Sequence, residues 1–187
     1  QYGGDIPVGA MTIFATVMQF VSLPITGIAQ GAQPIISYNH GAGRGDRVGA
    51  CCRLVLCASL TYSVLFWAVL SMFPSMFPRI FAEEQRFIAY SASMSGYFFP
   101  MLWVMGAQIS CQLMFVALGN AKVSLFLALL RKIFLLVPLI FLMPLLTADP
   151  VKGIFLAEPI SDTLACAATV TLFMRQYRVR ISSPDRY

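Results

Sequence analysis

Five long apolar runs occupy most of this 187-residue sequence, and they restrict the chain to one class of fold. The runs cover approximately residues 8–38, 51–73, 87–118, 123–146 and 153–174. A helix needs about 20 apolar residues to cross the roughly 30 Å hydrocarbon core of a bilayer. In lipid, backbone polar groups must be satisfied within the segment, and no run alternates as a barrel strand does. The sequence therefore predicts an all-α membrane protein, a polytopic helical bundle of about five transmembrane helices.

Composition favours a membrane protein and opposes a nucleic-acid-binding one. Hydrophobic residues make up 58% of the chain and charged residues 11%, against roughly 25% charged in soluble domains. The net charge is +5, but the 13 Lys and Arg are scattered between apolar runs and form no basic stripe with interleaved aromatics. We therefore predict a lipid bilayer as the surroundings of the chain and no nucleic acid as a partner.

Residue types suited to catalysis or metal binding are scarce. The chain has a single histidine, His40, and contains neither an HExxH nor a GxSxG motif. Its five cysteines are odd in number and show no CxxC spacing, which predicts buried free thiols without disulfides. The sequence thus predicts no enzyme, no metal site and no cofactor.

The distribution of basic residues predicts the orientation of the chain, because Lys and Arg accumulate in cytoplasmic loops. With five crossings, ten of them fall on the side of the C-terminus, with Arg131 and Lys132 included. Three, namely Arg79, Arg86 and Lys152, fall on the other side. We therefore expect a cytoplasmic C-terminus, an extracellular connection at residues 74–86 and an extracellular N-terminus preceded by at least one further helix.

The first span combines unusual length with polar groups near its cytoplasmic end. At about 1.5 Å per residue, residues 8–38 exceed the hydrocarbon thickness, and Pro24 and Pro34 predict a bent helix. The polar groups are those of Gln30, Gln33, Ser37 and Asn39. Two interpretations are open: the amides satisfy a neighbouring helix, or they line a water-filled cavity.

Three stretches of the sequence resemble the multidrug and toxic compound extrusion (MATE) family of transporters. The stretch "GIAQGAQPIISYNHGAG" at residues 27–43, followed by "RGDRV", is similar to the end of the second helix in the C-terminal half of that family. Residues 112–144 resemble the connection from the tenth to the eleventh helix, and "GIFLAEPISD" at residues 153–162 resembles the start of the twelfth. The resemblance implies twelve helices in two six-helix lobes. This chain would supply helices eight to twelve, without helix seven and the N-terminal lobe.

The same resemblance implies secondary active transport. A MATE antiporter exports organic, usually cationic, compounds such as drugs in exchange for Na⁺ or H⁺, while its two lobes rock about a central cavity. For this chain it implies the bacterial inner membrane, a small organic substrate, and the missing N-terminal lobe as a partner. The acidic ion-binding residues best known for the family lie in the first helix of each lobe and in the tenth helix. The tenth helix here has no carboxylate.

Two other functions stay open beside the antiporter. A lipid-linked oligosaccharide flippase of the same superfamily shares the plan of paired helical bundles. A non-transporting structural membrane subunit is the second alternative.

Two carboxylates lie within a predicted span, and both belong to the last one. Glu158 and Asp162 are four residues apart and hence on one helical face, and charges at membrane depth suggest a functional site. Asp162 either forms a structural ion pair with Arg131 of the preceding span or takes part in ion coupling. Glu158 likewise has either a structural or an ion-binding role.

Further candidates for a substrate or ion cavity lie in the first and third spans. In the first, Tyr38 joins Gln30, Gln33 and Asn39. In the third, Gln108 and Gln112 share one helical face, where amides either pack across the bundle, the commoner role, or contact substrate. Soft apolar side chains of the third span would form an adaptable wall for varied cations. They are Phe98, Phe99, Met101, Trp103, Met105, Met114 and Phe115.

Overall fold

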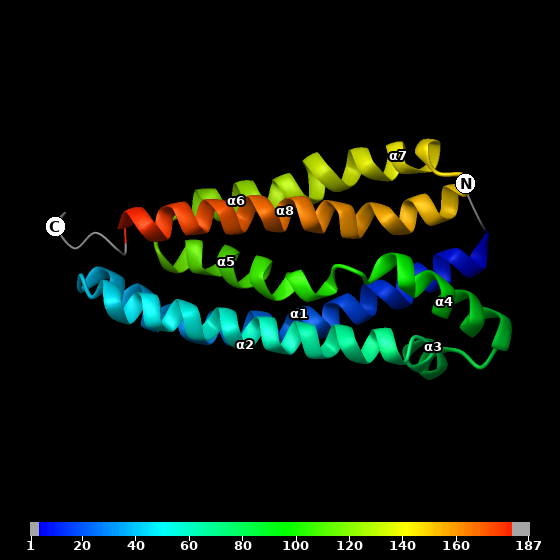
Figure 1. The fold of residues 1–187 in the computed structure, drawn as a ribbon, viewed down its shortest axis with the longest axis horizontal. Coiled ribbons are helices and arrows are strands. Elements are labelled where there is room, and N and C mark those ends of the chain that lie inside the picture. Colours follow the sequence, from blue (N-terminus) through cyan, green and yellow to red (C-terminus); the bar gives the residue numbers. More distant parts are fainter. Residues whose placement is uncertain (1–3, 181–187) are drawn as a thin grey trace.

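The computed structural model describes residues 4–180, which form a bundle of long helices lying side by side (Figure 1). No strand occurs in this part of the chain, so the prediction of an all-α fold is confirmed. In chain order the helices are α1 (Asp5–Gly41), α2 (Gly45–Met72), α3 (Met76–Phe81), α4 (Gln85–Phe98), η1 (Leu102–Val104), α5 (Met105–Ala117), α6 (Ala121–Leu129), η2 (Leu130–Leu136), α7 (Val137–Leu146) and α8 (Pro150–Arg180). Of these, η1 is a 3₁₀-helix and η2 is a π-helix.

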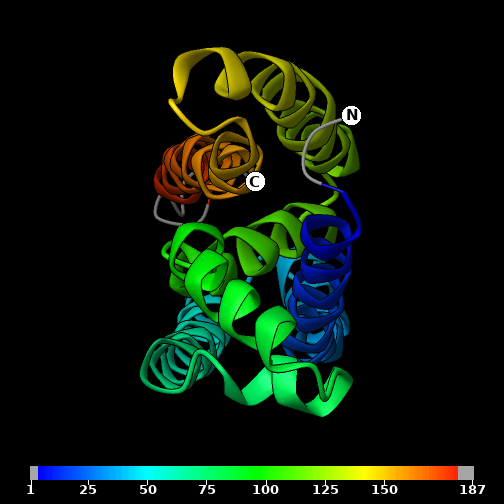
Figure 2. The same ribbon diagram turned by 90° about the vertical axis from the view of Figure 1, so that its right-hand side faces the viewer.

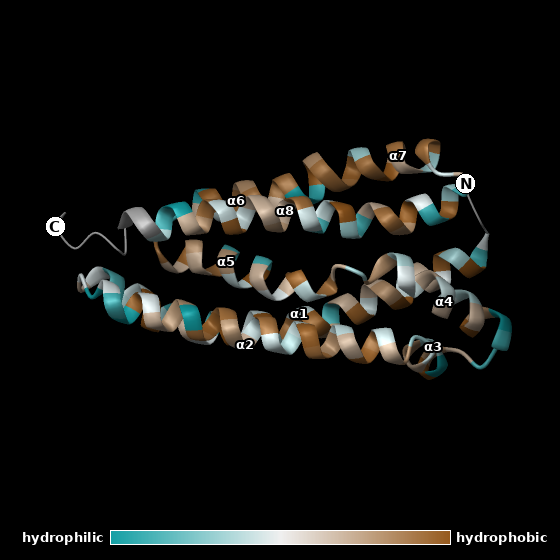
Figure 3. Cartoon of the chain, in the orientation of Figure 1, coloured by the Kyte–Doolittle hydropathy of each residue, from teal (hydrophilic) through white to brown (hydrophobic). Residues whose placement is uncertain are grey.

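Within residues 4–180, four helices are long and apolar enough to cross a membrane: Asp5–Gly41, Gly45–Met72, Ala121–Leu146 and Pro150–Tyr177. A fifth crossing arises if α4 and the segment Leu102–Ala117 are counted as one span, bent by 56° at its break. Apolar residues cover most of α6 and α7 in Figure 3. Length and composition therefore agree with the predicted number of spans.

The third predicted span, residues 87–118, is broken rather than continuous. α4 ends at Phe98, and a turn at residues 99–101 leads into η1 and α5. Pro100 lies in this turn. Proline has no N–H to donate, and its ring disfavours the α conformation of the residue before it. The helix therefore ends where the sequence predicts that it continues.

Phenylalanine rings surround this break and join three helices. The ring centroid of Phe14 on α1 lies 5.0 to 5.6 Å from those of Phe98, Phe99 and Phe155. Phe155 belongs to α8, and all four side chains are buried. Tilted and edge-to-face pairs at such distances are favourable beyond the area that they bury. The cluster thus holds α1, the break and α8 together.

The first two helices begin earlier than predicted. α1 starts at Asp5 rather than near residue 8 and continues through both Pro24 and Pro34 to Gly41. α2 starts at Gly45 rather than near residue 51, because the turn between the two helices occupies only residues 42–44. Gly43 has a φ of +68°, a left-handed conformation that glycine adopts without steric cost.

The arrangement of the spans is layered. Seen along the bundle in Figure 2, α8 lies between the α6–α7 span and the broken α4–α5 span, and α1 and α2 pack against α5. In the apolar windows of the spans, 50% of the residues of α8 are buried, against 6% of those of the α6–α7 span. α8 is therefore a central helix, and the α6–α7 span is an outer one.

The structure corrects one part of the orientation count. Arg131 and Lys132 lie near the middle of the span Ala121–Leu146, far from both of its ends, so they are not loop charges. Without them, eight basic residues remain on the side of the C-terminus against three on the other, although Arg186 lies outside the described residues. The bias keeps its direction, and the orientation itself stays a prediction.

All five cysteines are free thiols. Cys52, Cys111 and Cys166 are buried and Cys51 is half-buried, whereas Cys57 is exposed on the outer face of α2. The prediction of buried thiols is therefore wrong for Cys57, which faces away from the bundle.

Candidate functional site

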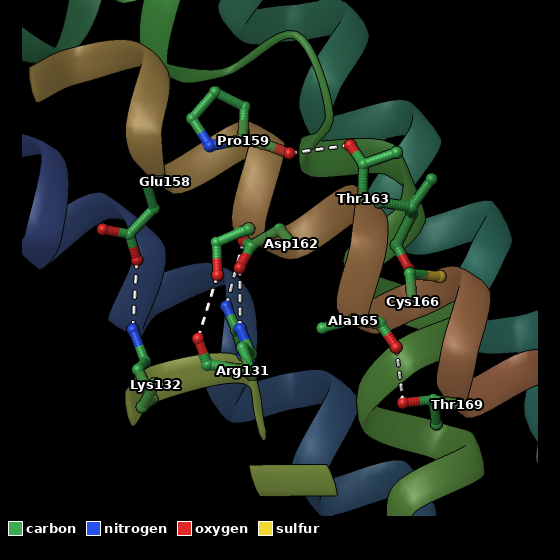
Figure 4. A network of polar contacts seen from close by, with 11 residues as sticks. Arg131, Lys132, Glu158, Pro159, Asp162, Thr163, Ala165, Cys166 and Thr169 are labelled. Atoms are coloured by element: carbon green, nitrogen blue, oxygen red, sulfur yellow. Dashed lines mark hydrogen bonds and ion pairs between the residues drawn. The ribbon is translucent and has the colours of Figure 1, made fainter. Parts of the chain in front are cut away.

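Two ion pairs join the α6–α7 span to α8 in the middle of the bundle (Figure 4). Arg131 donates from Nε to Asp162 Oδ1 at 2.7 Å and from Nη2 to Oδ2 at 3.0 Å. Lys132 donates from Nζ to Glu158 Oε1 at 3.1 Å. Arg131 lies ten residues into its helix, which corresponds to about 15 Å or half of the hydrocarbon thickness. Both pairs therefore lie near the middle of the span Ala121–Leu146, far from its ends.

A π-helical segment presents both cations to the same helix. Consecutive residues of a regular α-helix point about 100° apart, yet Arg131 and Lys132 both reach α8, on residues one turn apart. Both belong to η2, whose wider turn changes this angle. The hydroxyl of Ser161 also donates to the Arg131 carbonyl at 2.9 Å, which binds η2 to α8 through its backbone.

The two ion pairs differ in exposure. The side chains of Arg131 and Asp162 are 15% and 9% exposed, and their two parallel bonds have the fork geometry of a strong pair. The side chain of Lys132 is 55% exposed, and that of Glu158 is 16% exposed. Asp162 is therefore enclosed, whereas the Lys132–Glu158 pair is open on the Lys132 side.

A groove of about 390 Å³ lies beside these pairs, and we call it the charged groove. Its walls come from α1, the broken span, η2 and α8; they are formed by Met11, Ala15, Met18, Gln19, Ser22, Phe98, Met105, Ile109, Arg131, Lys132 and Glu158. The α1 residues recur every three or four positions and so share one helical face. The groove combines flexible apolar walls with charges at one side.

A second cavity extends the charged groove along α1. It measures about 430 Å³ and shares Met11 and Ala15 with the charged groove. Its other walls include Val8 on α1 and Val151 and Phe155 on α8. The face of α1 that points toward α8 is therefore open over several turns and apolar at its outer end.

Three polar residues of the charged groove, Lys132, Gln19 and Ser22, were not predicted from the sequence as site residues. The sequence predicts Lys132 as a cytoplasmic charge, whereas the structure places it in the π segment η2 in contact with Glu158. Gln19 and Ser22 carry a detectable signal, since they continue the spacing of Met11, Ala15 and Met18. In this arrangement Ser22 donates its hydroxyl to the Gln19 carbonyl, at 2.9 Å.

The described residues contain no group of three or more His, Cys, Asp or Glu side chains that could hold a metal ion. The polar chemistry of the charged groove is therefore that of one carboxylate, two cations, an amide and a hydroxyl. The carboxylate of such a set carries the negative charge that a cation can approach.

Comparison with protein families identifies the fold. A family model described as MatE matches residues 1–142. The chain belongs to the MatE family. The matched region ends inside α7, so the carboxylates of α8 lie beyond it.

Solved MATE structures match nearly the whole chain. One is described as the MATE multidrug transporter DinF-BH in complex with a ligand; it is 32% identical, with a TM-score of 0.82 over 96% of this chain and 40% of that chain. Two others are multidrug resistance MATE family transporters of the MOP superfamily. The outward-facing one is 15% identical, with a TM-score of 0.87 over 97% of this chain and 41% of the other. The inward-facing one is 14% identical, with a TM-score of 0.83 over 95% and 40%.

The chain spans about two fifths of the length of these transporters. No curated protein matches it in sequence.

In this MatE chain, the amides predicted in the first span do not line the charged groove. Gln30 and Tyr38 are exposed, Gln33 is half-buried and Asn39 is buried. Asn39 donates from Nδ2 to the Ile35 carbonyl of its own helix at 2.8 Å. Ser37 donates to the Ala117 carbonyl of α5 at 2.8 Å, so one polar group at this helix end packs against a neighbour. A contact of the amides with substrate stays a prediction.

The glutamines of α5 also lie outside the charged groove. Gln108 is 1% exposed, and its Oε1 atom has no hydrogen-bond partner within residues 4–180. Gln112 donates from Nε2 to the Ser124 carbonyl of α6 at 3.3 Å, a contact that packs two successive helices. Of the soft apolar side chains expected to form a wall, Phe98 and Met105 line the groove, while Met114 and Phe115 are buried in the core.

Proposed function

We propose that this chain forms part of the C-terminal lobe of a secondary antiporter that exports organic, cationic compounds, drugs among them, in exchange for Na⁺ or H⁺. The observation that carries the proposal is the charged groove in a MatE lobe, with an open ion pair at membrane depth. Ionisable residues are costly at this depth and mark ion or substrate pathways in transporters. A purely structural pair would not need an open groove beside it.

The lining of the charged groove suits varied organic cations. Methionine side chains are flexible and polarizable, and aromatic faces attract cations. Met11, Met18, Met105 and Phe98 provide both kinds of surface within one groove. The relative that was solved with a ligand is itself described as a multidrug transporter, which supports a substrate of this class here.

The lobe also fits transport by alternating access. Its fold resembles one part of both the outward-facing and the inward-facing transporter, with TM-scores of 0.87 and 0.83. Such similarity to both states is expected of a lobe that moves as one body around a site. In this proposal, the missing N-terminal lobe is the partner, the plasma membrane is the location, and the C-terminus is cytoplasmic.

Efflux of ethidium from cells tests the proposal. Cells that express the intact transporter are expected to lose preloaded ethidium faster than vector controls, and an ionophore that collapses the coupling gradient should abolish the difference. Imposing a Na⁺ or a pH gradient on membrane vesicles then identifies the coupling ion. The 187 residues alone, inserted in liposomes, should not transport, because the cavity lies between two lobes.

Ethidium retention equal to that of the vector control would contradict the antiporter. A defect in lipid-linked oligosaccharide supply in a deletion strain would then favour the flippase.

A further inference from the structure

We propose that the charged groove contains a cation site at Glu158 that the protein's own Lys132 ammonium occupies at rest. A transported or coupling monovalent cation would displace this ammonium in order to bind. The proposal rests on the proposed function and deepens it, because it names the residue that an incoming cation replaces. Lys132 would therefore be a competitor of the ligand and would not bind it.

The geometry shows that the Lys132–Glu158 pair is the one that can exchange. Within residues 4–180, Lys132 makes a single hydrogen bond to Glu158, at 3.1 Å, and its side chain is 55% exposed. The neighbouring Arg131 makes two bonds to Asp162, at 2.7 and 3.0 Å, and both side chains are 15% exposed or less. Figure 4 shows the two pairs on successive turns of α8. Both cations line the charged groove, but the Lys132–Glu158 pair is the more exposed and has the fewer hydrogen bonds of the two.

The chemistry of the two cations agrees with this difference. The lysine ammonium is a compact point charge on a flexible four-carbon stem, so it can leave a carboxylate by rotating its side chain. The arginine guanidinium is a planar fork that matches a carboxylate with two bonds. Lys132 can therefore release Glu158 while Arg131 keeps Asp162 neutralised and η2 bound to α8.

Among the described residues, no other acidic group of the charged groove competes for the role of Glu158. From α1 the groove receives the neutral polar groups of Gln19 and Ser22, and from the broken span only apolar side chains. Arg131 and Lys132 of η2 and Glu158 of α8 are its charged groups, and Asp162 lies behind them in its pair with Arg131. A cation that enters the groove therefore meets one exchangeable negative charge.

The volume of the groove sets the class of ligand. A space of about 390 Å³ with apolar walls accepts an organic monocation, and a proton or Na⁺ reaches the same carboxylate. The three share one chemistry, which is a single positive charge that replaces the ammonium at Glu158. The experiment has one arm for each of them.

Binding to the purified intact transporter tests the proposal, with fluorescence polarisation of ethidium as the readout. The first arm measures the ethidium Kd, the second the change in that Kd with added Na⁺, and the third the change on acidification in sodium-free buffer. In Lys132→Gln we expect the competing ammonium to be gone and the Kd of at least one of the three cations to fall about tenfold. In Lys132→Arg the guanidinium can donate two hydrogen bonds to Glu158 and is harder to displace, so binding of the same cation should weaken about tenfold.

Two further variants serve as controls. Lys152→Gln removes a lysine from another ion pair, with Asp149 at 3.5 Å, that does not line the groove, and it should leave all three arms within about twofold. Adding Glu158→Gln to Lys132→Gln should abolish the gain in affinity.

Unchanged or weaker binding of all three cations in Lys132→Gln would overturn the proposal, as would equal binding in Lys132→Arg and the parent protein. The second comparison applies even if Lys132→Gln does not fold, because Lys132→Arg keeps the charge.

Ethidium efflux by the parent protein separates this inference from the proposed function. If the parent protein exports ethidium and the Lys132 variants bind as it does, only the inference fails; if it exports nothing, the proposed function fails whatever the variants bind.

Discussion

Arg131 and Lys132 are adjacent in sequence, and at the scale of single residues their ion pairs should differ in what they contribute. Removing one partner of a buried pair leaves an uncompensated charge and costs about 3–5 kcal/mol. An exposed pair is worth about 0–1 kcal/mol, because water solvates the charge that remains. The enclosed Arg131–Asp162 pair belongs to the first class, and the open Lys132–Glu158 pair lies closer to the second.

The Arg131–Asp162 pair is expected to stabilise the fold. In the intact transporter, Asp162→Asn leaves the Arg131 guanidinium without a carboxylate, and Arg131→Met leaves the Asp162 carboxylate without a cation. Each variant should lower the melting temperature, because an unpaired charge inside a membrane span is costly. The double variant should recover part of the loss. Thermal unfolding in detergent measures all three; a double variant no more stable than either single one would exclude this role.

Glu158→Gln is expected to separate transport from stability. The variant removes the one exchangeable negative charge of the charged groove, so ion-driven ethidium efflux should fall to the vector level. Its melting temperature should change little, since the Lys132 side chain is 55% exposed in a groove that is open to water in the proposed transporter. Efflux and thermal unfolding are measured on the same variant. A large loss of stability with efflux preserved per folded molecule would reverse the assignment and make Glu158 structural.

One of the two ion pairs could be predicted from the sequence, and the other could not. Asp162 and Arg131 could be matched because two consecutive spans run antiparallel, so residues at similar distances from their connection lie at similar depth. The partner of Glu158 was not predicted, because adjacent residues of a regular helix point about 100° apart and are not expected to share one face. Both cations lie in the π segment η2, and Ser161 donates to the Arg131 carbonyl there; a one-dimensional pattern contains neither feature.

At the scale of elements, the crossing of α2 and α5 depends on one glycine. A Cβ atom at Gly106 would overlap the Ser63 hydroxyl and the Ser59 carbonyl of α2. Ser63 already donates to that carbonyl at 2.6 Å, so the serine is fixed and cannot move aside cheaply. Small residues at membrane helix crossings permit such close approach.

Gly106→Ala is therefore expected to destabilise the transporter by about 1–3 kcal/mol, as overpacking of a tight contact does. Gly96→Ala on α4 is the matched control, because no described residue offers an atom within 4 Å of its added Cβ. It should be neutral or stabilise the helix by up to about 1 kcal/mol. Melting temperatures of the two variants give the comparison; equal values would show that α2 and α5 separate without cost.

Prolines show why breaks in helices are harder to predict than helices. The sequence contains Pro24, Pro34 and Pro100 within predicted spans, and the first two predict a bend. The structure keeps α1 continuous through both and breaks the third span at Pro100. At Pro100 the rings of Phe98 and Phe99 are held against Phe14, so tertiary packing fixes the broken form. Local propensity alone does not distinguish the three positions.

At the scale of the whole molecule, the two ends of the bundle carry different charge. The turns at residues 42–44 and 118–120 lie at one end, and α3 and the connection between α7 and α8 lie at the other (Figure 1).

The sequence was sufficient for the all-α membrane class and the number of spans, because both depend on hydropathy and length. It was not sufficient for the charged groove, which depends on how four elements pack.

The orientation is expected to place the turn at residues 118–120 in the cytoplasm. Single cysteines at Ala121 and Glu83, both exposed, are introduced in a cysteine-free intact transporter. A membrane-impermeant maleimide should label Glu83→Cys in intact cells and Ala121→Cys only after the cells are opened. Labelling of Ala121→Cys alone in intact cells would show the opposite orientation.

The π segment also affects how this chain aligns with other sequences. A π turn holds one residue more than an α turn of the same helix. A relative whose eleventh helix is regular α should therefore be one residue shorter between positions 130 and 136, although every flanking residue matches. Such a gap inside a membrane span would ordinarily be treated as an alignment error. Here it would distinguish family members that have a π segment at the two ion pairs from those that have a regular helix there.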